Sequence, residues 1–225
     1  LDELGVVTKR PGEPAAVELD LSCPADLSRL RVHNVRVRAA DVQFVAGGTI
    51  SAPAGGDANA PPKIDVHASL TASRLEALSG LAPALKSRGL AGSVMVDVSS
   101  GDLAGGKIDR AILCLDRCRA NVDGRQFAAD GTCTVDGLDL GDWVRSDYDP
   151  NVPVVTSVAR LRCDGLEFRA GTTHGWVVAD LSNLPAAAKG KLDVLMPRLD
   201  LVELAGWLKD PNEPKADPNH PWRLT

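Results

Sequence analysis

Residues 191–208, KLDVLMPRLDLVELAGWL, combine the two patterns around which the chain is organised. Apolar and polar residues alternate over 191–196, which predicts a half-buried strand. After Pro197 the apolar residues recur at helical spacing over 199–208, with acidic and basic residues between them. A strand is therefore expected to lead directly into a short amphipathic helix.

The same succession is found over 64–85, IDVHASLTASRLEALSGLAPAL, which first alternates and then takes on helical spacing. This helix is expected over 73–87, ending before Gly89, a common residue at helix C-termini. Both junctions place a Ser or Pro before Arg-Leu, with an acidic residue next, at 73–75 and 197–199. Because a long-period repeat determines the architecture of a chain, we interpret the two junctions as parts of an internal repeat.

Most of the remaining sequence alternates between apolar and charged residues and is divided by turn residues. Alternation with one apolar face and short turns is typical of an antiparallel sheet. A single helical turn is expected over 24–30. Strands are expected over 17–23, 33–47 with a turn at 39–40, 64–71, 92–103, 107–118, 126–138, 153–171, 173–181 and 191–196.

The apolar face of such a sheet needs a cover. Two short helices are too few for roughly ten strands, because one helix shields only about two or three at a packing distance near 10 Å. The rest of the face needs a second sheet, closure of the sheet on itself, or an apolar ligand. Aromatic residues make up 4% of the chain, so aliphatic side chains must line most of this face and offer few anchors for a polar ligand.

Charge and hydropathy exclude several kinds of partner. A net charge of −5 with scattered basic residues argues against a nucleic-acid partner. No apolar run reaches the about 18 residues needed to span a bilayer, and no signal peptide is recognisable. Because the sequence begins at Leu1, we interpret it as a segment of a longer protein whose anchor or export signal lies elsewhere.

The five cysteines form an odd set that cannot all pair. Cys23, Cys133 and Cys163 are in phase with the apolar faces of their predicted strands, where a free thiol behaves as a small hydrophobic group. We therefore expect buried, reduced cysteines. If one disulfide forms, Cys114 and Cys118 are the pair to examine, although four residues along one strand normally separate the thiols too far.

Residue patterns for catalysis or metal binding are missing from the sequence. The four histidines stand far apart, without His-x-x-x-His or Cys-x-x-Cys spacing. Residues 147–151 resemble the start of a calcium loop, but Val152 and Val158 replace the glycine and glutamate that such a loop requires. No Gly-x-Ser-x-Gly or glycine-rich phosphate loop occurs, and the strand carboxylates fall on the polar phase. We therefore expect a non-enzymatic protein without a metal or cofactor.

Large apolar side chains leave a choice between a core and a binding surface. Trp143, Trp176, Trp207 and Phe168 either line an apolar binding surface or pack locally. The aliphatic residues of the strands pose the same choice. They form a closed core in a sandwich and a lipid-contacting lining in an open, curved sheet.

Three stretches together resemble the recurring unit of AsmA-like proteins. The first is the junction at 195–208, in which a strand, Pro-Arg-Leu-Asp-Leu and a helix ending in Trp-Leu precede a Pro-rich loop. The second is LEALSGLAPALKSRGLAGSVMVDVSSGDL, residues 75–103, and the third is CRANVDGRQFAADGTCTVDGL, residues 118–138. The resemblance covers most of 64–208 and, more loosely, 17–50.

This resemblance implies a periplasmic protein of Gram-negative-type bacteria, usually tethered to the inner membrane by an N-terminal helix. It implies a long antiparallel sheet that curls into a groove lined with aliphatic side chains. The family is similar to bridge-like lipid-transport proteins, whose groove shields acyl chains between two membranes. The inner and outer membranes would then be reached through parts of the parent chain outside these residues, and no catalytic residue is implied.

The predicted fold is mostly β, of the α+β class: a long curved antiparallel sheet forming an open groove, with two short amphipathic helices. The groove segment is expected over 17–208, with a flexible loop at 51–63, between an irregular segment at 1–16 and a Pro-rich linker or loop at 209–225. Its expected partner is phospholipid or another acyl-chain lipid, since each methylene that leaves water contributes about 0.8 kcal/mol. The predicted lining comprises Val35, Val37, Val66, Val94, Val96, Leu113, Leu161 and Phe168.

Two alternatives belong to other functional classes. The first is a structural or adhesive β-sandwich module of a cell-surface protein, with a dry, closed core. The second is a hydrolase or binding enzyme built from loops such as 142–153, which would need a cleft containing carboxylates of perturbed pKa.

Overall fold

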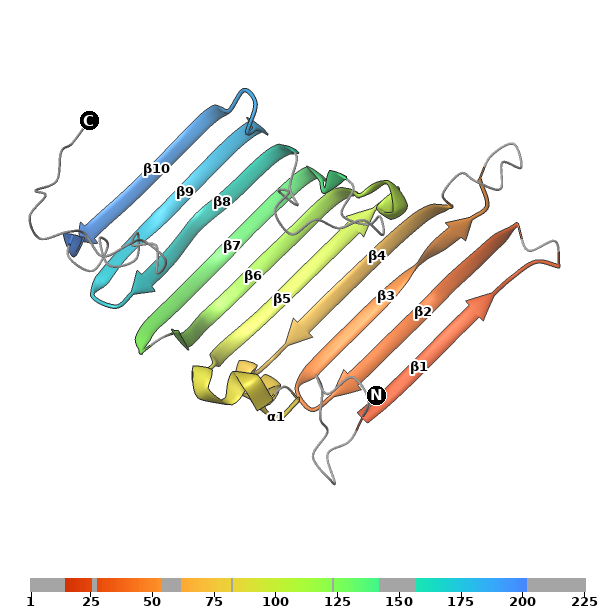
Figure 1. Ribbon diagram of the computed structural model, residues 1–225, viewed down its shortest axis with the longest axis horizontal. Coiled ribbons are helices and arrows are strands. Elements are labelled where there is room, and N and C mark those ends of the chain that lie inside the picture. Colours follow the sequence, from red (N-terminus) through yellow and green to blue (C-terminus); the bar gives the residue numbers. More distant parts are fainter. Residues whose placement is uncertain are drawn as a thin grey trace, which may run out of the picture.

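The computed structural model describes residues 15–25, 28–53, 62–81, 83–122, 124–141 and 157–201. Ten strands form one antiparallel sheet, and their spatial order is the same as their order in the sequence (Figure 1). The strands are β1 (Ala15–Ser22), β2 (Arg29–Ala39), β3 (Val42–Ser51), β4 (Lys63–Ala72), β5 (Ala91–Ser100), β6 (Lys107–Val122), β7 (Arg125–Asp139), β8 (Ser157–Ala170), β9 (Thr173–Leu184) and β10 (Lys189–Arg198).

The predicted alternation becomes two distinct faces because directly opposed residues on neighbouring strands share a side of the sheet. One row of opposed residues crosses every strand and is apolar throughout. This central row consists of Val17, Val37, Phe44, Leu70, Val96, Leu113, Cys133, Cys163, Ala179 and Leu192.

A second row on the same side runs beside the central row. It consists of Leu19, Val35, Ala46, Ala68, Val98, Ala111, Val135, Leu161, Leu181 and Gly190. We call this side of the sheet the apolar face and the opposite side the polar face.

The polar face carries cross-strand ion pairs. Arg160 Nη2 lies 2.6 Å from Asp180 Oδ2 between β8 and β9, and Arg36 Nη1 lies 3.3 Å from Glu18 Oε2 between β2 and β1. All four side chains are about one-third or more exposed, so these pairs contribute little to stability. The solvated charged face that the alternation predicts is therefore present.

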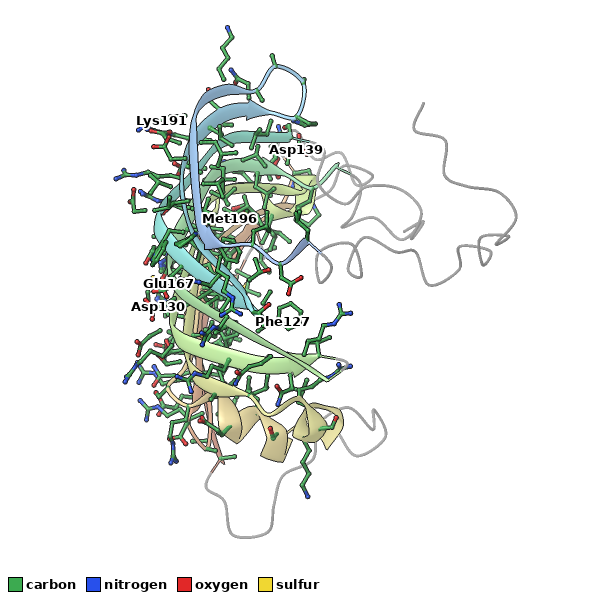
Figure 2. All side chains as sticks on the ribbon, turned by 90° about the vertical axis from the view of Figure 1, so that its left-hand side faces the viewer. Phe127, Asp130, Asp139, Glu167, Lys191 and Met196 are labelled. Carbon is green, nitrogen blue, oxygen red and sulfur yellow. A yellow bond between two sulfur atoms is a disulfide. The ribbon has the colours of Figure 1, made fainter. Side chains whose placement is uncertain are left out.

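The sheet is a single curved layer, seen from the side in Figure 2. Asp130, Glu167 and Lys191 lie on its convex side, while Phe127 points to the concave side (Figure 2). The regular pairing is interrupted in three neighbouring strands, between 115 and 118 in β6, 130 and 133 in β7, and 163 and 166 in β8. Bulges bend a strand and increase its twist, which accounts for curvature in this part of the sheet.

The predicted amphipathic helix over 73–87 is wrong as a continuous helix. The chain there forms the 3-10 turn η3 (Leu75–Ala77), the four-residue helix α1 (Leu78–Leu81) and the 3-10 turn η4 (Pro83–Arg88). Proline lacks the backbone N–H donor that a helix interior needs, so Pro83 interrupts the helix. Gly89, at a φ of 53°, terminates the segment as predicted.

The structure also differs from the predicted fold class and from the predicted ends of two strands. The fold is all-β rather than α+β, because α-helix within the described residues is confined to α1 and the single residue Leu201. The second predicted helix lies almost wholly outside the described residues, and no described helix is long and apolar enough to cross a membrane. Arg29 and Leu30 belong to β2 rather than to a helical turn, and Ala15 and Ala16 already belong to β1.

Little of the apolar face is buried. The buried apolar residues are mostly small, such as Ala72 at 1% and Ala179 at 3% exposure. All ten strands belong to the same sheet, so within the described ranges no second sheet packs against the apolar face. The sandwich alternative therefore lacks its second layer there, and most of the larger apolar residues remain accessible.

A candidate binding surface on the apolar face

The structure places all eight predicted lining residues on the apolar face. Three of them belong to the central row and two to the row beside it. Val66 and Val94 lie two positions from row members on their own strands, and Phe168 opposes Gly175 of β9. The members of the two rows are Val37, Val96, Leu113, Val35 and Leu161.

These side chains are accessible even in the middle of the sheet. Leu70 on β4 and Leu113 on β6 are 38% and 37% exposed, although strands flank them on both sides. At the two outer strands the exposure rises, reaching 72% for Val17 on β1 and 55% for Leu192 on β10. The apolar face is therefore accessible on most of its strands, whereas its central-row members on β8 and β9, Cys163 and Ala179, are buried.

Gly175 brings two large apolar side chains together at the β8 to β10 end of this surface. A Cβ atom at Gly175 would lie 2.6 Å from the backbone oxygen of Leu195, 3.1 Å from Phe168 Cζ and 3.2 Å from Met196 Cγ. The missing side chain therefore leaves room for the β10 backbone and for the side chains of Phe168 and Met196 beside Gly175. Glycine in a strand interior often marks such a close approach.

Trp176 does not join the binding surface. It opposes Glu167 of β8 and Leu195 of β10, which places it on the polar face. Its ring packs edge-on against His174, with the ring centres 5.2 Å apart. Trp143 and Trp207 lie outside the described residues, so Phe168 is the candidate aromatic that the structure places on the apolar face.

The prediction of reduced cysteines is wrong for two of the five. Cys133 and Cys163 are joined by a disulfide between β7 and β8, and their Cα atoms are 4.3 Å apart. Both belong to the central row, so the bridge forms part of the apolar surface. Cys23 also departs from the prediction, because it is exposed rather than buried.

The other suggested disulfide, between Cys114 and Cys118, does not form. Cys114 opposes Met95 and Thr132 on the polar face, and its sulfur accepts a hydrogen bond from Thr132 Oγ1 at 3.6 Å. Cys118 lies past the β6 bulge and opposes Ala129. The bulge turns the two thiols to opposite sides of the sheet, so they cannot meet.

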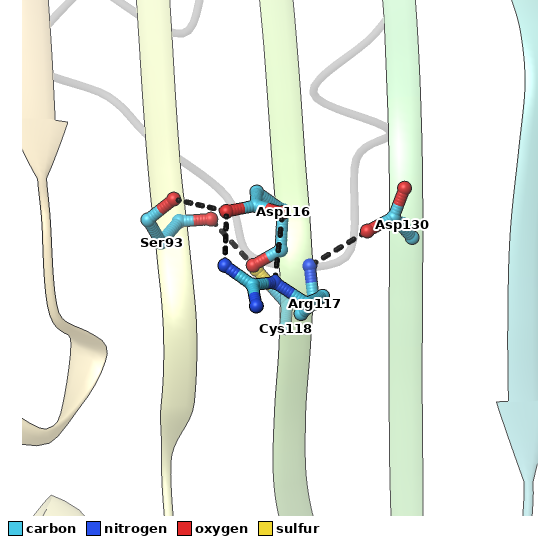
Figure 3. A network of polar contacts seen from close by, with 5 residues as sticks. All are labelled: Ser93, Asp116, Arg117, Cys118 and Asp130. Carbon is cyan, nitrogen blue, oxygen red and sulfur yellow. Dashed lines mark hydrogen bonds and ion pairs between the residues drawn. The ribbon is translucent and has the colours of Figure 1, made fainter.

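A polar network fixes this bulge (Figure 3). Arg117 has a positive φ of 47°, and its backbone N–H donates to Asp130 Oδ2 at 2.7 Å. Its guanidinium donates to Asp116 at 3.2 Å, and this hydrogen bond and charge raise the pKa of Arg117. Ser93 Oγ donates to the same carboxylate at 3.4 Å. These bonds compensate the unpaired backbone of the bulge and hold Cys118 toward the apolar side.

Cys118 itself is buried, and burial raises the pKa of its thiol. The thiol donates to the carbonyl of Ser93 at 2.9 Å. A protonated thiol in this position acts as a packed, hydrogen-bonded group, because nucleophilic chemistry needs the thiolate.

The polar face has a depression of about 340 Å³ beside this bulge. Arg119, Arg169 and His174 line it together with Asp130 and Glu167. It contains cations and carboxylates side by side. Within the described residues, no group of three or more His, Cys, Asp or Glu side chains is arranged to hold a metal ion.

Comparison with known proteins adds no identification: no family model, no curated protein and no solved structure matches this chain. The resemblance to AsmA-like proteins therefore stays a prediction.

Proposed function

We propose that this chain is a non-enzymatic lipid-binding segment whose apolar face shields acyl chains during lipid movement between the inner and outer membranes. The observation that carries the proposal is the central row. It is apolar on every one of the ten strands, and eight of its ten members are at least partly exposed, Cys163 and Ala179 being buried. A contiguous exposed apolar surface of this kind marks an interaction site for an apolar partner.

The dimensions of the row suit an acyl chain. Strands lie about 4.8 Å apart, so the nine intervals between ten strands give a row roughly 43 Å long. The hydrocarbon core of a bilayer is about 30 Å thick, so one leaflet contributes roughly 15 Å of acyl chain. The row is therefore long enough for more than one lipid, or for a lipid that moves along it.

The chemistry of the row favours acyl chains in general over one particular lipid. Its members carry no hydrogen-bonding side chain, except that two of them form the Cys133–Cys163 bridge. Each methylene removed from water contributes about 0.8 kcal/mol without a directional bond. Displacement along the face then breaks no specific contacts, as transport requires.

The polar face is suited to contact with water, which leaves the apolar face as the side that binds lipid. Its ion pairs, such as Arg160 with Asp180, are exposed and suited to contact with water. A sheet that is wet on one side and apolar on the other can hold lipid on its concave side only. The Cys133–Cys163 disulfide supports placement in a compartment that permits disulfides, as the periplasm does.

The direct test is native mass spectrometry of the chain purified from a bacterial host without detergent, followed by solvent extraction of whatever accompanies it. We expect phospholipid to co-purify. A folded wild-type protein with only the lipid-free mass, and no binding of added phospholipid, would overturn the proposal.

Matched variants assign the binding to one face. Leu70→Asp and Leu113→Asp place a charge on the apolar face at positions 38% and 37% exposed, and both should lose the lipid. Met95→Asp is the control: Met95 is also 38% exposed but opposes Thr71 on the polar face. Circular dichroism and urea midpoints establish that the compared variants are folded. Equal lipid loss in Met95→Asp would contradict binding at the apolar face.

A further inference from the structure

The two outer strands of the sheet have complementary charges. On the polar face, β1 carries Glu18 and Asp20, whereas β10 carries Lys189 and Lys191. All residues of both strands are exposed, and no described strand pairs with their outer edges. An unpaired strand edge is a template for pairing with another chain.

The direction of the strands permits these two edges to meet. Every neighbouring pair in the sheet is antiparallel and the sheet has ten strands, so β1 and β10 run in opposite directions. A second copy that is shifted along the sheet without rotation therefore brings its β1 antiparallel to β10. Its apolar face then lies on the same side as that of the first copy.

At matching positions of the two outer strands, the backbone N–H and C=O groups both point away from the sheet. Along a row, opposed pairs alternate between hydrogen-bonded pairs and closer, non-hydrogen-bonded pairs. The 4.3 Å Cα separation of Cys133 and Cys163 identifies a non-hydrogen-bonded pair. Because the two kinds of pair alternate along the central row, Val17–Val37 and Ala179–Leu192 are also non-hydrogen-bonded pairs. The N–H and C=O groups of Val17 and Leu192 consequently point to the outer edges.

A straight continuation of the central row fixes the register. Leu192 then opposes Val17 of the next copy, which places Lys191 opposite Glu18 and Lys189 opposite Asp20. Both stretches are regular, since the pairing shifts occur only after Asp20 in β1 and after Leu195 in β10. One register thus matches apolar residues on one face and opposite charges on the other.

We propose that copies of this chain associate head to tail, with β10 of one copy pairing with β1 of the next in this register. The interface joins two different surfaces, so the assembly is open and can extend. Within one chain Glu18 contacts Arg36 and Arg38, and Lys191 contacts Asp193. In the assembly Glu18 and Lys191 would interact with each other in addition to these partners. Association through backbone and edge charges does not require lipid, and it lengthens the apolar face beyond one chain.

Charge reversal tests the proposal on the full chain after removal of lipid. The double variants Glu18→Lys/Asp20→Lys and Lys189→Glu/Lys191→Glu should each associate at least about tenfold more weakly than wild type. A mixture of the two should recover the association, because each basic edge then faces an acidic one. Sedimentation velocity over a concentration series measures all three samples. A monomeric wild type at every concentration, or unchanged association of either variant, would overturn it.

Cysteine cross-linking tests the register in a Cys23→Ser background, which removes an exposed thiol. Chains with Glu18→Cys mixed with chains with Lys191→Cys should form a covalent dimer under mild oxidation. Lys189→Cys with Glu18→Cys is the control, because these positions are two residues out of register. Equal cross-linking of both mixtures would contradict the predicted pairing, whatever the outcome of the lipid experiments.

Discussion

Cys133 and Cys163 face each other directly across β7 and β8, and their disulfide lies within the central row of the apolar face. The bridge joins residues that are 30 positions apart in the sequence. It therefore fixes the pairing of two central strands and, through them, the alignment of the apolar row. A bridge at this site also adds no polar group to the surface.

Removing this bridge should lower the free energy of unfolding by about 3 to 4 kcal/mol, the loop-closure entropy expected for about 30 residues. The double variant Cys133→Ala/Cys163→Ala tests this by urea unfolding, with Cys114→Ala as the control. Thiol titration of the denatured, unreduced wild type should find Cys23, Cys114 and Cys118 free. Five reactive thiols before reduction would contradict the bridge.

Cys118 and Cys23 should differ in their reaction with iodoacetamide. Burial raises the pKa of the Cys118 thiol, so at pH 8 it holds less thiolate than an exposed cysteine and is also less accessible. Mass spectrometry of peptides after short labelling should show Cys23 modified first, with the Cys118 rate rising only at higher pH. Comparable rates at pH 8 would be inconsistent with a buried, protonated Cys118.

Asp180 should titrate below the ordinary range of aspartate. The hydrogen bond from Arg160 lowers its pKa, assisted by the charges of Arg160 and Arg162. The small contribution of this exposed pair to stability is complete above the ordinary pKa of aspartate and is lost as pH falls through the lowered pKa. Carboxyl NMR titration should show the Asp180 pKa rising toward its usual range in Arg160→Ala. Arg36→Ala, on β2 at the far end of the same polar face, should leave it unchanged.

Gly48→Ala should destabilise the sheet far more than Gly47→Ala. A Cβ at Gly48 would run into the backbone oxygen of Asp65 on β4, whereas a Cβ at Gly47 would lie 3.3 Å from the backbone oxygen of His33. Overpacking of this kind costs about 1 to 3 kcal/mol. Urea midpoints of the two variants give the comparison, and equal midpoints would show that β3 and β4 separate more easily than the structure indicates.

The strands and their two faces could be predicted from the sequence because alternation with period two survives in nearly every strand. Val35 and Val37 illustrate this, since each is flanked by polar or charged residues and each lies on the apolar face. Which residues oppose each other could not be predicted, because register depends on turn geometry and bulges. The alternation therefore predicts that Cys133 and Cys163 lie on the apolar face, but it does not predict that they oppose each other.

The sequence indicates only some of the bulges. Past the Asp164-Gly165 step the apolar phase of β8 shifts by one residue, and the structure has a bulge there. In β6 the bulge lies at Arg117, which has a left-handed backbone conformation. This conformation is unusual for arginine and cannot be predicted from a single sequence. The network of Asp116, Asp130 and Ser93 that holds it depends on three different strands. Sequence periodicity carries no information about such contacts.

Each strand of the sheet pairs only with strands adjacent in the sequence, so tension on either end of the chain would remove strands one at a time. Tension applied beyond β10 would detach β10 and then β9, and would next meet a covalent bond, because β8 is tied to β7. Tension applied before β1 could detach β1 to β6 before it reached that bond. The disulfide thus makes the protein mechanically asymmetric, with a short extensible arm on the C-terminal side and a long one on the N-terminal side.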